Sequence, residues 1–244
     1  MGSSGNWQSG APREMPGVGG TLGATAMVTT KPDGYTVTQL PLGIYRLPHM
    51  QKMAFDPVAD LTHIVCLTGY TFGIAATMDA PFKTLKEMVD WARANPGKLT
   101  YGHTGTTPHL AFEEFALKAG FKTQDVPYKG SAEIMQAILG GHIPVMSGTT
   151  EFAPHVRAGK LRLLATLGRE RNKAFADVPT VKESGLPSHN VASWNALAAP
   201  AKTPRAVIDR LQRAALQALA MPSVRAQLQA LGVRRIADWG TQRQ

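Results

Sequence analysis

Apolar and polar positions along the chain follow two alternating periods, which predict repeated units of a strand, a turn and a helix. Short apolar runs bounded by turn residues predict strands over residues 35–40, 62–67, 71–76, 99–101, 123–126, 143–146 and 161–166. Apolar residues spaced three and four apart predict helices over residues 84–94, 109–119, 131–139, 153–158, 204–219 and 222–231. This alternation is typical of an α/β fold with largely parallel sheets and crossover helices.

Length and composition fit one large or two modest globular domains. The chain has 244 residues, of which 43% are hydrophobic and 18% charged, a balance that allows real cores. No apolar stretch approaches the ~20 residues that a bilayer span needs, so we expect no direct membrane insertion. The first residues show no basic segment followed by an apolar one, so no signal peptide is predicted in this chain, and residues 1–14 are expected to be a flexible leader.

The net charge of +9 allows three interpretations. The basic residues can lie on solvated helix faces, or their combined field can attract an anionic ligand. Nucleic-acid binding is the weakest of the three, because the basic residues are spread along the chain without a zinc-finger, helix-turn-helix or aromatic–basic motif. We therefore expect no nucleic-acid partner.

Three predicted strand-to-helix junctions carry the residues best suited to hold an anion. At such junctions the free backbone N–H groups and the positive end of the helix dipole favour negative charge, and small hydroxyl side chains add neutral donors. The first junction contains His103, Thr104, Gly105, Thr106 and Thr107, the second contains Tyr128, Lys129 and Gly130, and the third contains Ser147, Gly148 and Thr149. Taken alone, each junction is also consistent with an ordinary capping loop.

The sequence lacks the common signatures of catalytic, metal and cofactor sites. It contains no Gly-x-Ser-x-Gly nucleophile motif and no phosphate loop ending in Gly-Lys-Ser/Thr, and no predicted strand precedes the glycine-rich segment 15–23. His103 and His109 are six residues apart, which is not a usual spacing for metal ligands. No nearby acid in the sequence could orient either histidine as a general base. We predict no metal and no cofactor, and an enzyme that uses His103 or His109 is the weaker alternative.

An ordered set of short segments resembles one protein family. The segments are Pro16-Gly17-Val18-Gly19-Gly20, Lys31-Pro32-Asp33-Gly34-Tyr35-Thr36, Phe55-Asp56-Pro57-Val58-Ala59-Asp60-Leu61, Ala94-Asn95-Pro96-Gly97-Lys98-Leu99-Thr100-Tyr101-Gly102, Val126-Pro127-Tyr128-Lys129-Gly130, Ala158-Gly159-Lys160-Leu161-Arg162, Asp177-Val178-Pro179-Thr180 and Ala199-Pro200. In this order, over residues 15–232, they resemble the substrate-binding proteins of tripartite tricarboxylate transporters, the Bug-type periplasmic receptors.

The resemblance implies a two-lobed, type II periplasmic-binding-protein fold. By similarity, lobe I holds residues 15–98 and 198–244, and lobe II holds residues 99–197. The chain would cross between the lobes near residues 99–101 and return near residues 193–197. The family's opening strand, its Pro/Gly-rich loop and its first helix have no counterpart in this sequence, so the resemblance implies an N-terminally truncated form of the fold.

The resemblance also implies a function without catalysis. A small mono-, di- or tricarboxylate would be captured between the lobes in the periplasm and delivered to membrane transporter subunits. The three junctions would line the cleft from lobe II, while Leu42 and Gly43 would face them from lobe I and Ser193 and Trp194 would lie at the return crossing. Ser147 or Gly148 stands where the family often has an Asp, which favours a plain carboxylate over an amino acid.

Two further alternatives remain open from the sequence. A ligand-sensing partner of a signalling receptor would use the same cleft, so the residues cannot separate it from a transport receptor. A non-functional remnant that lacks the first strand would fit the same motifs.

Overall fold

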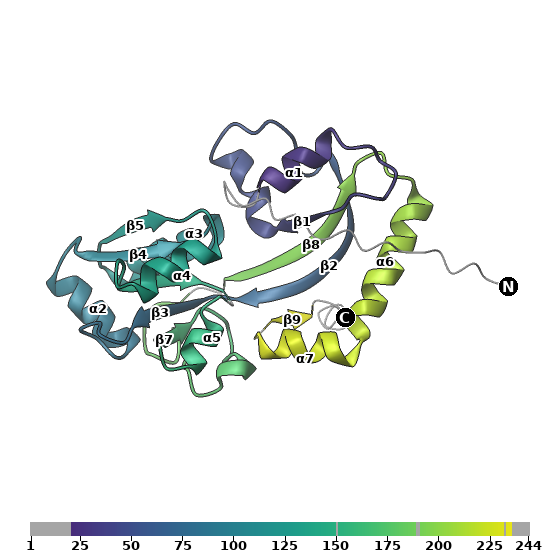
Figure 1. The fold of residues 1–244 in the computed structure, drawn as a ribbon. Helices are drawn as coiled ribbons and strands as arrows, with labels where there is room; N and C mark the ends of the chain where they lie inside the picture. The colour runs from purple at the N-terminus through teal and green to yellow at the C-terminus, as the bar shows by residue number, and fades with distance from the viewer. Residues whose placement is uncertain (1–20, 150, 189–190, 232, 236–244) are drawn as a thin grey trace.

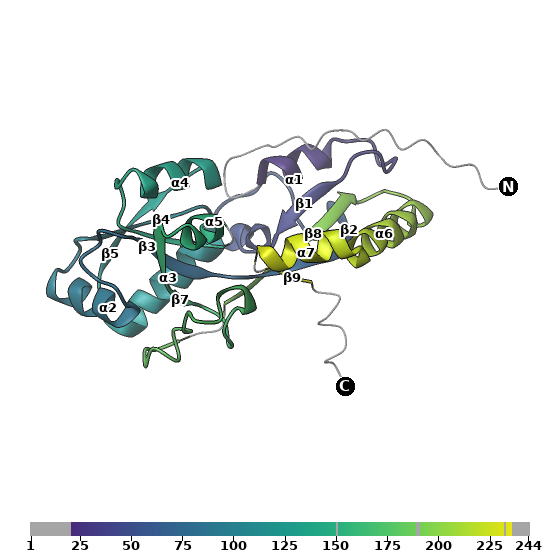
Figure 2. The same ribbon diagram turned by 60° about the horizontal axis from the view of Figure 1, so that its bottom comes forward.

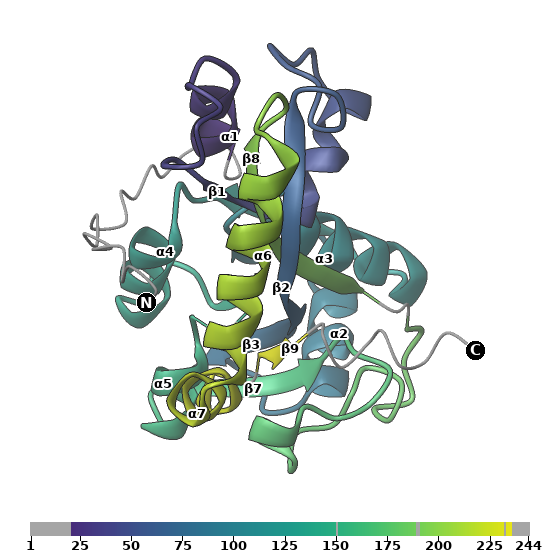
Figure 3. The same cartoon turned by 90° about the vertical axis from the view of Figure 1, so that its right-hand side faces the viewer.

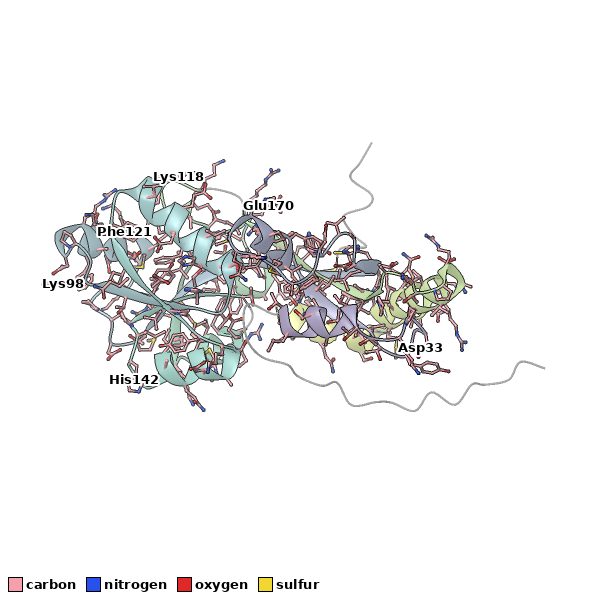
Figure 4. All side chains as sticks on the ribbon, turned by 90° about the horizontal axis from the view of Figure 1, so that it is seen from above. Asp33, Lys98, Lys118, Phe121, His142 and Glu170 are labelled. Atoms are coloured by element: carbon pink, nitrogen blue, oxygen red, sulfur yellow. The ribbon has the colours of Figure 1, made fainter. Side chains whose placement is uncertain are left out.

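The computed structural model describes residues 21–149, 151–188, 191–231 and 233–235, and it contains two β-sheets that each carry helices on both faces (Figure 1). The four-stranded sheet has the order β1-β8-β2-β9, and the five-stranded sheet has the order β5-β4-β6-β3-β7. The two sheets lie end to end (Figure 2). In the view of Figure 4, Asp33 lies toward the outer end of one half and Lys98 toward the outer end of the other.

The four-stranded half is built around two long strands. It contains α1 (Thr21–Val28), β1 (Thr38–Pro41), the 3-10 helices η2 (Leu42–Tyr45) and η3 (Leu47–His49), β2 (Leu61–Thr71), β8 (Ala192–Pro200), α6 (Arg205–Ala220), α7 (Pro222–Ala230) and β9 (Arg234–Arg235). Neighbouring side chains of a strand point to opposite faces. Ala198 accordingly packs with Met27 of α1, and Ala199 packs with Ile208 of α6. Figure 3 shows α6 lying along β2 and β8.

The five-stranded half alternates strands and helices. It contains β3 (Gly73–Thr77), α2 (Leu85–Ala94), β4 (Leu99–His103), α3 (Thr106–Ala119), β5 (Thr123–Pro127), α4 (Ser131–Leu139), β6 (Val145–Gly148), α5 (Ala153–Arg157), β7 (Leu161–Thr166) and η4 (Lys173–Phe175). One face of the sheet packs on α2 and α3 through side chains such as Tyr101 and Phe112. The other face packs on α4 through Met146 and Ile134.

The parallel strand pairs lie where the predicted junctions are. β4 pairs in parallel with both β5 and β6, whereas β3 pairs antiparallel with β6 and β7. The strand pairs of the four-stranded sheet are all antiparallel. The α/β fold is as predicted, and its parallel core is formed by β5, β4 and β6. Because parallel strands end at the same edge of a sheet, the three junctions come together at one edge.

The first crossing between the sheets differs from the predicted one. β2 ends at Thr71 in the four-stranded sheet, and β3 begins at Gly73 in the five-stranded sheet, so the chain crosses at the buried Phe72. The predicted crossing near residues 99–101 is therefore wrong, and residues 73–98 lie in the five-stranded half. The sequence predicts a break at residues 68–70 between two strands, but it does not show that the second strand joins another sheet. The return lies directly before β8, close to the predicted residues 193–197.

The helix α1, the strands β8 and β9 and the 3-10 helices were not predicted from the sequence. The helix α1 occupies a Thr- and Ala-rich segment, and β8 occupies an Ala-rich one. None of the helices in the part of the chain that the structure describes has the length and apolar character needed to cross a bilayer.

Candidate functional site

The three predicted junctions lie together at the edge of the five-stranded sheet where the chain enters from the other half. Gly73, the first residue of β3, pairs with Gly148 at the end of β6 and with Thr166 at the end of β7. His103 at the end of β4 pairs with Ser147 and with Pro127. The crossing and the three junctions therefore share one edge (Figures 1 and 2).

The first junction leaves the start of α3 without a side-chain cap. Gly105 is the residue before the helix, and its φ of 136° lies where L side chains are rarely found. The first N–H groups of any α-helix lack intrahelical partners, and here no side chain of the capping residue accepts from them. Thr104 and Thr106 are half-buried and Thr107 is buried. This start of a 14-residue helix can donate to an anion.

The 3-10 helix η2 faces the first junction from the other half. A Cβ placed on Gly43 would lie 3.6 Å from Thr107 Oγ1 and 3.8 Å from Thr106 Cβ. Gly43 therefore lies opposite the junction, as expected, and Leu42 precedes it as the first residue of η2. Directly after η2, the Arg46 guanidinium Nη1 donates to Thr107 Oγ1 at 3.1 Å.

Arg46 was missed by the analysis of the sequence. It follows Leu42 and Gly43 closely and is the one Lys or Arg between Lys31 and Lys52. A cation in a segment already expected to face the cleft was the signal that could have identified it.

Two backbone amide groups of the second junction already have partners. The Tyr128 N–H donates to the carbonyl oxygen of His103 at 2.9 Å, and the Lys129 N–H donates to Glu133 Oε2 at 2.8 Å. The Lys129 side chain is exposed, and the Tyr128 ring packs closely enough on Gly102 that a Cβ there would lie 2.9 Å from Tyr128 Cε2. Burial raises the pKa of the Tyr128 hydroxyl, with a smaller contribution from Glu133. Gly130 precedes α4 and offers no side-chain cap.

The hydroxyl groups of the third junction have partners inside the protein. The fully buried Ser147 hydroxyl donates to the carbonyl oxygen of Pro108 at 2.9 Å, which ties β6 to the first turn of α3. The Thr149 N–H and hydroxyl donate to Glu151 Oε2 at 3.1 and 2.7 Å. A Cβ on Gly148 would lie 2.5 Å from Glu151 Oε1. Glu151 therefore accepts from both donors of Thr149, so these donors are not free for a ligand. The pattern of the sequence did not reveal this role of Glu151.

Trp194, which was predicted to lie at the return crossing, packs against Tyr45 of η2. Its ring centroid is 5.5 Å from that of Tyr45, whose ring is 5.6 Å from that of His63. The Tyr45 hydroxyl is hydrogen-bonded to His63 Nε2. Burial raises the pKa of the Tyr45 hydroxyl to about 12, with a smaller contribution from the nearby Cys66. Ser193, the neighbour of Trp194 in β8, is buried.

His103 points beneath α3, where it meets two polar side chains. Its Nε2 lies 3.4 Å from Asp125 Oδ2, and its ring stacks on that of His109 with centroids 4.5 Å apart. Burial is the main influence that lowers the pKa of His103, and Asp125 partly offsets it. The parallel register places Asp125 opposite Tyr101, which brings an acid 22 residues away in the sequence next to His103. The prediction considered only acids nearby in the sequence, and the fold brings Asp125 next to this histidine.

A hollow of 630 Å³ lies apart from the junctions, in the four-stranded half, lined by residues of η3 and of the segment 51–58 with Tyr45. Its wall includes exposed residues such as Lys52 and Val58. The junction edge combines uncapped helix starts with Arg46, so it is the better candidate for an anion site.

Comparison with known proteins identifies close relatives of the chain. A family model described as "Tripartite tricarboxylate transporter family receptor" matches residues 13–243. A curated relative from Cupriavidus necator, the "UPF0065 protein in gbd 5'region", is 46% identical over 215 residues, which cover 87% of this chain and 65% of the relative. The chain spans 65–66% of the length of the first curated relatives that it matches.

Solved structures share the fold. The periplasmic binding protein BugD superposes with a TM-score of 0.86 and 27% identity, over 91% of this chain and 76% of BugD. MatC from Rhodopseudomonas palustris with bound malate superposes with a TM-score of 0.82 and 29% identity, over 89% of this chain and 76% of MatC. These matches confirm the resemblance found in the sequence motifs and the periplasmic-binding-protein fold that it implies.

Proposed function

Because the chain belongs to the tripartite tricarboxylate transporter family receptors, we propose that it captures a small organic carboxylate between its two halves. The relatives with solved structures are substrate-binding proteins rather than enzymes, and one of them holds malate. A mono-, di- or tricarboxylate is the class of ligand that the positive groups at the junction edge favour. Delivery to a membrane transporter from the periplasm is part of the same proposal.

The observation that carries the proposal is the meeting of Arg46 with the start of α3. The guanidinium and the helix N-terminus are both positive, and placing them together is unfavourable unless an anion or an acceptor lies between them. Thr107 Oγ1 supplies one acceptor at 3.1 Å. Among the residues that the structure describes, Arg46 has no carboxylate partner. A ligand carboxylate at this place would accept from the guanidinium and from the first N–H groups of α3.

The two halves offer a way to open and close this site. They are joined by the crossing at Phe72 and by the return before β8, and η2 in one half touches α3 in the other. Rotation about two crossings would separate Arg46 from Thr107 and admit the ligand, as in other hinged binding proteins. No covalent step and no cofactor are needed for such capture.

A ligand panel tests the proposal directly. The purified chain is titrated with malate, adipate, citrate and benzoate, and binding is followed by calorimetry and thermal unfolding. A ligand present at one hundred times its Kd should raise the free energy of unfolding by about 2.7 kcal/mol. A folded protein that responds to none of these acids, nor to a wider set of carboxylates, would contradict the proposal.

Two variants test the place of binding. Arg46→Gln removes the guanidinium and Thr107→Val removes its acceptor, so each should weaken carboxylate binding at least about tenfold, since hydrogen bonds to charged groups contribute about 1.5–3 kcal/mol. Lys86→Gln, which removes an exposed cation on α2, is the matched control and should bind as the unmodified protein does. Unchanged affinity in Arg46→Gln would place the ligand elsewhere.

A further inference from the structure

A second polar cluster lies on the face of the five-stranded sheet that carries α2 and α3, beside the junction edge. His103 comes from the end of β4, His109 from the first turns of α3 and Asp125 from β5. The parallel register of β4 and β5 sets Asp125 opposite Tyr101, and His103 follows two residues later on the same face. Because α3 starts directly above this edge, His109 completes the cluster.

The three side chains lie close enough together for small rotations to place their ligand atoms around one ion. His103 Nε2 lies 3.4 Å and His109 Nδ1 lies 3.9 Å from the same atom, Asp125 Oδ2. One ligand atom of each residue lies within 4.8 Å of the others. N–H···O hydrogen bonds are usually about 2.7–3.2 Å long, so these contacts are loose as hydrogen bonds. Ligand atoms about 2.0–2.1 Å from a tetrahedral ion are about 3.4 Å from one another.

His103 also carries a buried nitrogen that has no partner. The residue is 7% exposed, and its Nδ1 forms no hydrogen bond. A buried polar atom without a partner is costly and uncommon in folded proteins. The nitrogen that faces Asp125 is Nε2, so an ion bound there would fix the tautomer of this imidazole and leave the proton on Nδ1.

An outer set of hydrogen bonds holds the second histidine in place. His109 Nδ1 lies 2.9 Å from the Tyr101 hydroxyl, which itself donates to Glu113 Oε1 at 2.8 Å. The Thr123 hydroxyl donates to the same carboxylate oxygen at 2.8 Å. Because the Tyr101 hydroxyl donates to Glu113, it accepts from His109 Nδ1–H, so Nδ1 carries the proton and Nε2 is the nitrogen left to bind an ion. Partners that accept from the other ring nitrogen in this way orient the histidine ligands of metal sites.

We infer that His103, His109 and Asp125 form a binding site for a divalent transition-metal ion of the Zn²⁺ class. Two imidazoles and one carboxylate suit Zn²⁺, Co²⁺ and Ni²⁺ better than Mg²⁺ or Ca²⁺, which prefer oxygen ligands alone. Water would complete the coordination, because His109 and Asp125 have side chains that are 28% and 47% exposed and give the ion access. This inference replaces the prediction from sequence spacing that the chain binds no metal.

The metal would fasten the first turns of α3 to the ends of β4 and β5. His103 immediately precedes the residues 104–107 of the first junction, so an ion here would hold that junction in place. Its role would be structural, and the carboxylate proposed above does not touch it. Metal binding and carboxylate binding can therefore be tested separately.

The test uses the full chain after treatment with a chelator. Titration with Co²⁺ should give visible d–d absorption bands that saturate at one ion per chain, and Zn²⁺ should displace them. Asp125→Asn and His109→Gln should each weaken Co²⁺ binding at least about tenfold, since even outer partners of metal ligands contribute about 10–100-fold. His142→Gln, which removes an exposed histidine elsewhere in the same half (Figure 4), is the matched control and should bind Co²⁺ normally.

Three outcomes would overturn the inference. They are the absence of d–d bands in a protein whose circular dichroism shows it to be folded, unchanged binding in both Asp125→Asn and His109→Gln, and equal loss in His142→Gln. Both cluster variants alter partly exposed side chains, so if one of them fails to fold, the other still gives the answer.

Discussion

Single residues decide which of the predicted donors are free for a ligand. The sequence identified the hydroxyls of Ser147 and Thr149 correctly as side chains at the junction edge. It could not reveal that Ser147 donates to Pro108, because packing between β6 and α3 brings these residues together. Thr149 donates to Glu151 only two residues away, and this local contact was not predicted either. The sequence did offer a signal for Arg46, a cation in the segment expected to face the cleft, but not its partner Thr107, which lies 61 residues away.

Glu183 provides a prediction on pH at the residue scale. The Thr180 N–H donates to Glu183 Oε2 at 2.8 Å, and Arg171 Nε donates to both carboxylate oxygens at 3.0 Å. These hydrogen bonds, led by that of Thr180, hold the pKa of the Glu183 carboxyl below its usual value. A lowered pKa in the folded state means that the stabilisation is present above the ordinary Glu pKa of about 4.3 and is lost as the pH falls through the folded value.

The variant Glu183→Gln should therefore have a lower Tm than the unmodified protein at pH 7, and the difference should shrink as the pH falls below about 4.3. Thermal unfolding followed by circular dichroism between pH 7 and acid measures both curves. Asp177→Asn, an exposed carboxyl of the same segment, serves as the control and should change the Tm little. A Tm difference for Glu183→Gln that does not depend on pH would contradict the assignment.

At the scale of elements, local patterns predicted most of the five-stranded half. The helix expected over residues 131–139 and the strand expected over residues 161–166 have those same bounds in α4 and β7. The helix α2 begins after Thr84, whose hydroxyl accepts from the Glu87 N–H at 3.2 Å, a start signal that lies within four residues. β8 escaped prediction because its Ala-rich sequence becomes a strand through pairing with β1 and β2 on either side.

The contact between β4 and the second junction can be tested with Gly102. A Cβ at this position would lie 2.5 Å from Ile143 Cδ1 and 2.9 Å from Tyr128 Cε2. Gly102→Ala should therefore lower the free energy of unfolding by about 1–3 kcal/mol through overpacking, and it should displace Tyr128. Chemical denaturation measures the change.

A second substitution separates this overpacking from other effects. Ile143→Val removes the Cδ1 atom that the new methyl group would meet first. The double variant should therefore be more stable than the sum of the two single variants predicts. Strictly additive changes would show that Ile143 is not the neighbour that matters.

For the whole molecule, the two halves and their order of elements followed from the family resemblance, but the first crossing did not. None of the family motifs covers residues 62–93, so they do not mark the crossing, and Phe72 is itself an apolar residue of the kind expected within a strand. Which sheet a strand joins is decided by its partners: β2 pairs with β8, and β3 with β6 and β7. These partners lie far along the chain, so no local pattern carries the information.

A second contact between the halves lies away from Arg46 and tests their hinged relation. Arg157 of α5 donates through Nη2 to the carbonyl oxygen of Ala230 at the end of α7, and its guanidinium lies 5.3 Å from the centre of the Phe175 ring. Figures 1 and 3 show α5 and α7 side by side. Because Arg157 is exposed, Arg157→Ala should lower the free energy of unfolding by only about 0.5–1.5 kcal/mol.

The larger effect of Arg157→Ala should be on how far the two halves open relative to each other. Without this link, the ligand-free protein should adopt a wider range of openings, which small-angle X-ray scattering would detect as an increased radius of gyration. A saturating carboxylate should return the radius to that of the unmodified protein, because the ligand binds the closed form more tightly than the open ones. Lys160→Ala, which removes a neighbouring exposed cation, should leave the scattering unchanged. Identical scattering from Arg157→Ala and the unmodified protein would show that Arg157 does not restrain the hinge.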